Sequence, residues 1–154
     1  ICTNTDEIEH CRELIETLPQ MHFNIAAITT MSPKLMDLQS YENVSLYPGA
    51  VASVFDELFQ KCDYYFDINR HNEIVSAVRR AFLHNHLIFA FRETLHNGEY
   101  VADEHIYPTA EFDRIVLDVR NVMENTSVLE QHLEMQRRHA LAEDVEAYRR
   151  AISE

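Results

Sequence analysis

The feature that most limits the possible folds is a regular alternation between short apolar runs and amphipathic segments with helical spacing. The predicted strands cover residues 1–2, 23–29, 44–47, 64–68, 87–91 and 105–107. The predicted helices cover residues 6–18, 32–38, 52–60, 73–84 and 111–123. Because the strands are nearly continuous apolar runs, helices should cover both faces of the sheet. Short repeated crossovers of this kind indicate right-handed βαβ units and a parallel sheet.

The predicted fold is therefore a doubly wound, Rossmann-like α/β domain with a charged helical tail. We assign residues 1–123 to the α/β lobe and residues 124–154 to the tail, which should pack back on the lobe or on a missing N-terminal lobe. A chain of 154 residues has the length of one domain, and 46% hydrophobic residues are enough to form a hydrophobic core. It begins at Ile1 without a methionine, and we interpret it as a fragment.

Polar residues follow several predicted strands at the edge where such sheets bind ligands, beyond the carboxyl ends of the strands. The candidate ligand-binding residues are Thr29, Thr30, Asn69, Arg70, His71, Asn72, Glu73 and Glu93. Asn69, Asn72 and Glu73 stand at a predicted helix start, where free N–H groups could hold an anion or hydroxyls. The alternative, favoured from sequence alone, is that Asn72 caps the helix and Glu73 suits its first turn.

Two further residues of this edge have open roles. Glu93 could contact a sugar hydroxyl or a neighbouring chain, or it could only pair with Arg92, since sheet-edge loops often carry function. Arg70 could neutralise a phosphate, although Asp67 is a competing neighbour. The segment around His96, in the long loop before the next strand, is expected to be polar and mobile.

Composition excludes several classes of function. The net charge is −13, from 26 acidic and 13 basic residues, so nucleic acid is not an expected partner. Gly49 and Gly98 are the only glycines, which excludes the glycine-rich loops that cradle phosphates. The nine histidines form no metal-ligand set, and no serine nucleophile motif is present. We therefore predict no metal and no catalytic residue.

Cysteine content and hydropathy indicate the compartment. Cys2, Cys11 and Cys62 are odd in number and widely spaced, which fits neither a disulfide framework nor a metal knuckle. A reducing cytoplasm is the simplest setting. No apolar stretch reaches the roughly 18 residues of a membrane span. The expected location is the cytoplasm, with peripheral association at the inner face of the cell membrane left open.

Four segments together resemble a known family: TNTDEIEH, FNIAAITTMSPKLMDLQSYENVSLYPG, CDYYFDINRHNEI and AVRRAF with LIFAF. They are similar to the C-terminal half of a GT-B glycosyltransferase-like protein, the non-catalytic stabilising subunit of the accessory Sec glycosyltransferase pair. The resemblance covers most of residues 1–123. It implies two partners: a catalytic subunit that adds N-acetylglucosamine to adhesins, and the serine/threonine-rich acceptor polypeptide itself.

The sequence departs from catalytic relatives of this fold where the donor diphosphate would bind. Where those enzymes carry an Arg and a Lys, this edge offers only threonines and an asparagine, and Arg70-His71 replaces the expected His-Gly. Burying a diphosphate without cationic partners costs several kcal/mol. The resemblance thus implies an acceptor-binding subunit without a cofactor. The alternative is a lobe that binds UDP-N-acetylglucosamine in an active transferase, with Asn69, Asn72 and Glu73 near hydroxyls and Arg70 on phosphate.

Overall fold

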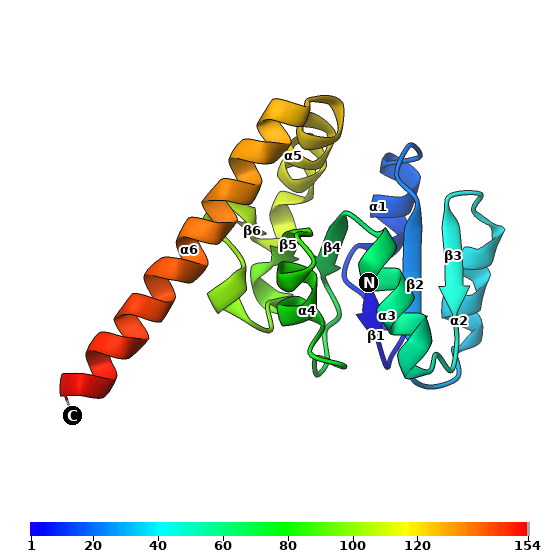
Figure 1. Cartoon of the computed structure of the whole chain (residues 1–154). Coiled ribbons are helices and arrows are strands. Elements are labelled where there is room, and N and C mark those ends of the chain that lie inside the picture. Colours follow the sequence, from blue (N-terminus) through cyan, green and yellow to red (C-terminus); the bar gives the residue numbers. More distant parts are fainter. Residues whose placement is uncertain (154) are drawn as a thin grey trace.

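The computed structural model describes residues 1–153 and confirms the α/β fold with a helical tail (Figure 1). The strands are β1 (Cys2–Thr3), β2 (Phe23–Ala27), β3 (Val44–Tyr47), β4 (Tyr64–Asp67), β5 (Leu87–Phe91) and β6 (Ile106–Tyr107). The α-helices are α1 (Cys11–Thr17), α2 (Pro33–Met36), α3 (Ala52–Lys61), α4 (Ala77–Leu83), α5 (Phe112–Glu124) and α6 (Thr126–Ser153). Five 3₁₀ turns complete the described chain: η1 (Asp37–Ser40), η2 (Arg92–Thr94), η3 (Gly98–Tyr100), η4 (Asp103–His105) and η5 (Thr109–Glu111).

The strands form two parallel three-stranded sheets, in the orders β1-β2-β3 and β4-β5-β6. The two sheets lie side by side with β1 next to β4, so the strand order reverses at this boundary (Figure 1). An antiparallel bridge between Ile8 and Asn69 joins the loops beyond the two strands, through backbone hydrogen bonds from Glu9 N–H to Ile68 O (2.8 Å) and from Arg70 N–H to Glu7 O (3.0 Å). Such a reversal is where open α/β sheets bind ligands.

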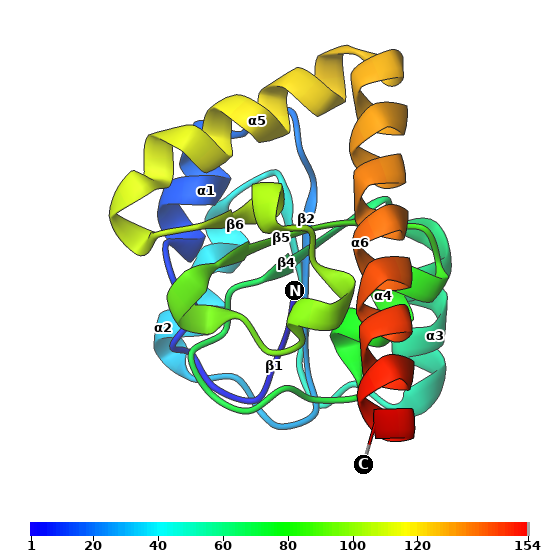
Figure 2. The same ribbon diagram turned by 90° about the vertical axis from the view of Figure 1, so that its left-hand side faces the viewer.

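Alternation along β5 explains why helices cover both faces. Leu87, Phe89 and Phe91 face a core shared with α1, α2 and α5, whereas Ile88 and Ala90 face a core shared with α3 and α4. Figure 2 shows α1, α2 and α5 on one side of the strands and α3 and α4 on the other. All five residues of the strand are fully buried, and each large apolar side chain contributes about 1.5–3 kcal/mol through burial.

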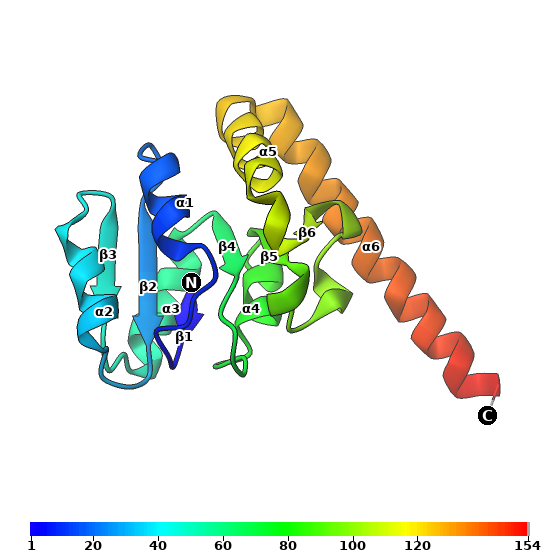
Figure 3. The same ribbon diagram turned by 180° about the vertical axis from the view of Figure 1, so that it is seen from behind.

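Helix α6 docks on the lobe through apolar contacts of Leu129 and Leu133 with the core and through several polar groups. The buried Gln136 carboxamide accepts from Ile88 N–H (3.0 Å) and donates to His86 O (2.8 Å), at the start of β5 where β6 does not reach. His132 hydrogen-bonds His105 (2.7 Å), and His139 hydrogen-bonds Gly98 O (2.7 Å). The end of the helix extends beyond the lobe (Figure 3).

Two helices begin later than the sequence predicts. Helix α1 begins at Cys11, not near residue 6, because the backbone before it is hydrogen-bonded to the loop after β4. Helix α4 begins at Ala77, not at residue 73. Val75 and Ser76 before it both have a left-handed φ, of 51° and 52°. This backbone conformation is disfavoured for residues other than glycine, most of all for β-branched Val75. No sequence pattern predicted it.

Candidate functional site

The carboxyl edge of the sheet, meaning the side on which the carboxyl ends of the strands lie, brings together most of the predicted site residues. The loops after β1, β4 and β5 meet there, at the boundary between the two sheets. We call residues 69–73 the 69–73 loop. The structure determines which of its side chains hold the loop and which are open to a ligand.

Asn69 is a structural residue of this loop. It is 3% exposed, and its Oδ1 accepts from His71 N–H at 2.8 Å. Its Nδ2 donates to Asn72 O (3.4 Å) and to Cys2 O at the end of β1 (3.5 Å). Its side-chain amide therefore shapes the loop and links the two sheets, which leaves little hydrogen-bonding capacity for a ligand.

The two basic side chains of the 69–73 loop, Arg70 and His71, contact carboxylates from the loop after β1. Arg70 forms an ion pair with Glu9, whose side chain is 10% exposed. His71 Nε2 lies 2.7 Å from Glu7 Oε2. The positive charge that the sequence offers to a phosphate is thus engaged within the protein. Lys34 comes after β2 and Arg92 after β5, the strands that pair with β1 and β4. Both side chains are exposed and form no ion pair with any residue in 1–153.

A third charged pair, Asp67 and His96, was not among the predicted site residues. Asp67 ends β4, its side chain is 2% exposed, and its carboxylate accepts from His96 Nδ1 (2.6 Å) and His96 N–H (2.8 Å). The other ring nitrogen of His96 contacts the carbonyl of His71. The hydrogen bond to Asp67 raises the pKa of His96 to about 9. The segment expected to be mobile is therefore bound to the 69–73 loop.

Glu73 and Glu93 both cap backbone groups. Glu73 Oε1 accepts from Val78 N–H (2.9 Å) in the first turn of α4, so the capping expected of Asn72 is carried out by its neighbour. Glu93 Oε2 accepts from Thr109 N–H (2.9 Å) and the Thr109 hydroxyl (2.7 Å), and the latter bond lowers the pKa of Glu93. Neither the predicted Glu93–Arg92 pair nor a free Glu93 is observed.

Asn72, Thr29 and Thr30 are the predicted site residues that remain open. All three are exposed, and the Asn72 side chain makes no hydrogen bond to any residue in the described range. Thr29 and Thr30 line a hollow of about 270 Å³ between the loops after β1 and β2. Its other polar groups come from Asn4, Thr5, Asp6 and Ser32, and its apolar lining from Ala27, Met31 and Leu35. Hydroxyls, an amide and a carboxylate suit a neutral hydroxylated ligand better than an anion.

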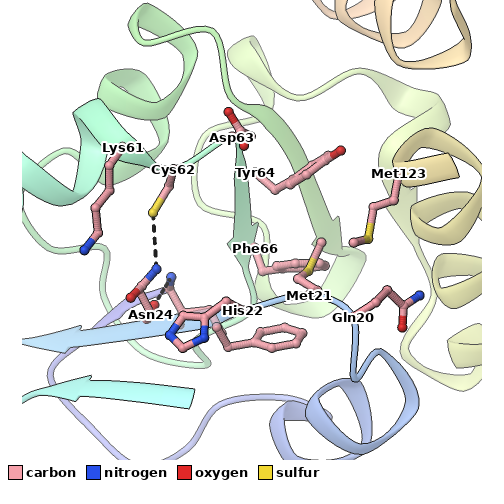
Figure 4. Close-up of a pocket in the computed structure, with 12 residues that line it drawn as sticks. Gln20, Met21, His22, Asn24, Lys61, Cys62, Asp63, Tyr64, Phe66 and Met123 are labelled. Atoms are coloured by element: carbon pink, nitrogen blue, oxygen red, sulfur yellow. Dashed lines mark hydrogen bonds between the residues drawn. The ribbon is translucent and has the colours of Figure 1, made fainter. Parts of the chain in front are cut away.

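A second hollow, of about 380 Å³, lies at the opposite edge of the sheet (Figure 4). It is lined by apolar side chains such as Phe66 and Met123, and by Asn24, which donates from Nδ2 to Cys62 Sγ (3.4 Å). This hollow lies at the amino ends of β2 and β4, on the opposite edge from the carboxyl ends of the strands. No group of three or more possible metal ligands occurs in the part of the chain that the structure describes. None of the helices described there is both long and apolar enough to cross a membrane.

A family model described as the GftB/GlyA-F C-terminal domain matches residues 1–136. The chain belongs to this family. It is 43% identical over 152 residues to the UDP-N-acetylglucosamine–peptide N-acetylglucosaminyltransferase stabilizing protein GtfB of Streptococcus agalactiae, covering 99% of the chain and 34% of that relative. The GtfB stabilizing protein of Limosilactobacillus reuteri subsp. suis is 40% identical over the same shares. Glycosyltransferase GlyE of Streptococcus pneumoniae is 29% identical over 79% of the chain and 30% of the relative.

Solved structures agree with this assignment. A crystal structure of a GtfA/B complex bound to UDP and GlcNAc matches with a TM-score of 0.84 and 37% identity, over 90% of the chain and 31% of the matched chain. The crystal structure of GlyE from S. pneumoniae matches with a TM-score of 0.72 and 27% identity, over 79% of the chain and 31% of that protein. The chain therefore spans about a third of the length of the GftB/GlyA-F relatives it matches.

Sequence reasoning found the edge but not the pairing of its charges. The predicted helix over residues 6–18 includes Glu7 and Glu9, but in the structure both lie in a loop and contact His71 and Arg70. Only the antiparallel contact between the loops after β1 and β4, which are some 60 residues apart, brings these charges together. The one available signal was the surplus of acidic residues just after the first strand.

Proposed function

We propose that the chain is the C-terminal lobe of a stabilising subunit that works with a catalytic O-N-acetylglucosaminyltransferase, and that its carboxyl edge binds the serine/threonine-rich acceptor polypeptide, not a nucleotide sugar. The support for the pairing is the 36–43% identity to four relatives named as GtfB stabilizing proteins. On this proposal the polypeptide is that of a serine-rich adhesin handled by the accessory Sec system. The compartment is the cytoplasm, which fits three unpaired thiols at Cys2, Cys11 and Cys62.

The observation that carries the choice of ligand is the engagement of charge at the sheet boundary. A bound diphosphate needs cationic side chains that pair with it out of water. If such a side chain already pairs with a carboxylate, binding the diphosphate leaves that carboxylate unpaired, which costs free energy. Arg70, His71 and His96 each already have a carboxylate partner. An acceptor polypeptide brings backbone amides and hydroxyls without net charge, which exposed groups such as Asn72 and Thr30 can hydrogen-bond.

One observation favours a second candidate, a lobe that binds UDP-N-acetylglucosamine in an active transferase. Lys34 and Arg92 are exposed and flank the boundary, so they offer charge that is not internally paired. The resemblance to GlyE, a protein named as a glycosyltransferase, points the same way. The two candidates differ in a property that can be measured directly, the affinity for a uridine nucleotide.

Calorimetric titration of the purified chain with UDP and UDP-N-acetylglucosamine separates them. We expect no saturable binding, that is, a Kd weaker than about 1 mM. Glu9→Gln should release Arg70 from its carboxylate and tighten UDP binding, whereas Glu13→Gln, an exposed glutamate that does not contact Arg70, should not. A Kd below about 50 μM for the unmodified chain would favour the nucleotide-binding lobe.

Binding of the polypeptide needs the full-length protein and its catalytic partner. Asn72→Ala removes an open side chain of the edge without removing any side-chain hydrogen bond to residues 1–153, so stability should not change. We expect it to weaken capture of a serine/threonine-rich polypeptide several-fold. Asn121→Ala, on the exposed side of α5, is the matched control. Equal capture by both variants would argue against acceptor binding at Asn72.

A further inference from the structure

The backbone N–H and both ring nitrogens of His96 face oxygen acceptors at the end of β4 and in the loop after it. Its backbone N–H and Nδ1 both point at the Asp67 carboxylate, at 2.8 and 2.6 Å, and Nε2 contacts the carbonyl of His71. A neutral imidazole can donate from only one ring nitrogen, whereas an imidazolium donates from both. When Asp67 is a carboxylate, both acceptors are oxygens without hydrogens, and the charged ring is the form that can donate to both.

The carboxylate of Asp67 needs this partner. It is 98% buried as a side chain, and a buried carboxylate is stable only when paired and hydrogen-bonded. Among the described residues, His96 is the only group that forms an ion pair with it. The loop after β5 is further fixed by the Thr94 hydroxyl, which donates to Asp67 O (2.8 Å) and lies within 3.2 Å of Phe91 O.

We propose that His96 is a positioning residue of the carboxyl edge: clamped by Asp67, it holds the carbonyl of His71 and so fixes the 69–73 loop in the form that the acceptor meets. This role rests on the proposed function, because the ligand is the acceptor polypeptide of that proposal. His96 itself is not assigned a contact with the ligand. It acts through the backbone that places Asn72 at the surface.

The charged state persists at neutral pH. The hydrogen bond to Asp67 is the largest cause of the raised pKa of about 9, ahead of the opposing effect of burial and the attraction of Asp67 and Glu73. The ionisable side chains of the 69–73 loop have other partners: Arg70 pairs with Glu9, the His71 ring is turned to Glu7, and Glu73 accepts from Val78 N–H. The clamp is therefore closed at neutral pH and opens as the pH rises through about 9.

Two variants test the clamp in the isolated chain. His96→Asn removes the donor to the carbonyl of His71, and Asp67→Asn removes the charge that holds the ring. His84→Asn, at an exposed histidine outside the edge, is the control. By NMR, the His96 ring should titrate near pH 9 in the wild type and nearer the ordinary value of about 6.5 in Asp67→Asn.

Amide hydrogen exchange separates a local clamp from general instability. Loss of a hydrogen bond from a charged donor should speed exchange at the Arg70 and His71 amides about ten- to a hundredfold. Exchange at the buried amide of Phe89 in β5 should stay within about threefold of the wild type. Unchanged exchange at Arg70 and His71 in both clamp variants would overturn the inference, as would acceleration of equal size at Phe89.

The functional test measures polypeptide capture by the full-length protein. If the clamp positions the edge for the acceptor, His96→Asn should weaken polypeptide capture about tenfold or more, and His84→Asn should leave it unchanged. Faster loop exchange with unchanged capture would refute the positioning role, and it would also place acceptor binding elsewhere than the 69–73 loop. Unchanged exchange with capture intact would refute the clamp and leave the proposed function standing.

Discussion

Gln136→Leu should destabilise the lobe more strongly than a typical helix substitution. The Gln136 side chain is 2% exposed and satisfies two backbone groups, Ile88 N–H in β5 and His86 O just before it. Leucine fills a similar volume but satisfies neither group. An unsatisfied buried donor or acceptor costs about 1–3 kcal/mol, so the variant should lose about 2–5 kcal/mol of unfolding free energy. That is a large fraction of the 5–15 kcal/mol typical of a domain.

Urea unfolding followed by far-UV circular dichroism measures this change, because the chain has no tryptophan to report on folding. The midpoint should fall while the slope stays constant, as expected when only the stability of the native state changes. Gln131→Leu, at an exposed glutamine of the same helix, is the matched control and should shift the free energy by less than about 0.5 kcal/mol. A Gln136→Leu protein as stable as this control would refute the view that the carboxamide completes the open side of β5.

Substitutions at three further residues test other parts of the fold. Asn43→Ala should cost about 1–2 kcal/mol in urea unfolding, since its Nδ2 is shared among three carbonyls at the end of α1 and beyond, at 3.1–3.3 Å. Glu73→Ala should cost about 1 kcal/mol by removing the acceptor for Val78 N–H, and Glu73→Gln should restore most of it; equal losses in both would exclude a capping role. His105 has its pKa lowered to about 4, first by burial and then by His132, so the unfolded chain takes up the proton first. Stability should fall as the pH drops from about 6.5 to 4, by about 2–3 kcal/mol from this residue, and His105→Phe should flatten that part of a pH–stability profile.

The sheet was predictable because its strands are apolar on both faces. Continuous runs such as Leu87–Phe91 have few alternatives to a strand buried between helices, and the structure confirms this strand and Val44–Tyr47 at the expected bounds. Helix starts were less predictable. The residues before α1 have good helix signals, but the loop contact to Asn69 removes their backbone groups from a helix. Tertiary contacts overrode local propensity there.

The side-chain partners of the edge residues also depend on tertiary contacts that the sequence pattern does not reveal. Sequence placed Arg70, Glu73 and Glu93 at the correct edge, because strand ends follow from the strands themselves. It could not tell which partner each would take, since a carboxylate serves equally well as a cap, an ion-pair partner or a ligand contact. The choice depends on loops that approach from distant parts of the chain, as when the Thr109 hydroxyl donates a hydrogen bond to Glu93.

The C-terminal half of helix α6 carries an apolar stripe that does not face the lobe. Four apolar residues, Leu141, Val145, Tyr148 and Ile152, repeat at the spacing of a buried stripe, yet all four are exposed, at 42–68%. At 100° per residue, Leu141 lies about 200° around the helix from His139, which faces the lobe. The docking face combines Leu129 and Leu133, which pack on the core of the lobe, with polar groups at His132, Gln136 and His139, whose partners are another histidine and backbone groups. Apolar contacts and hydrogen bonds to the backbone that the lobe leaves unpaired at this edge therefore decide together which face of the helix turns inward.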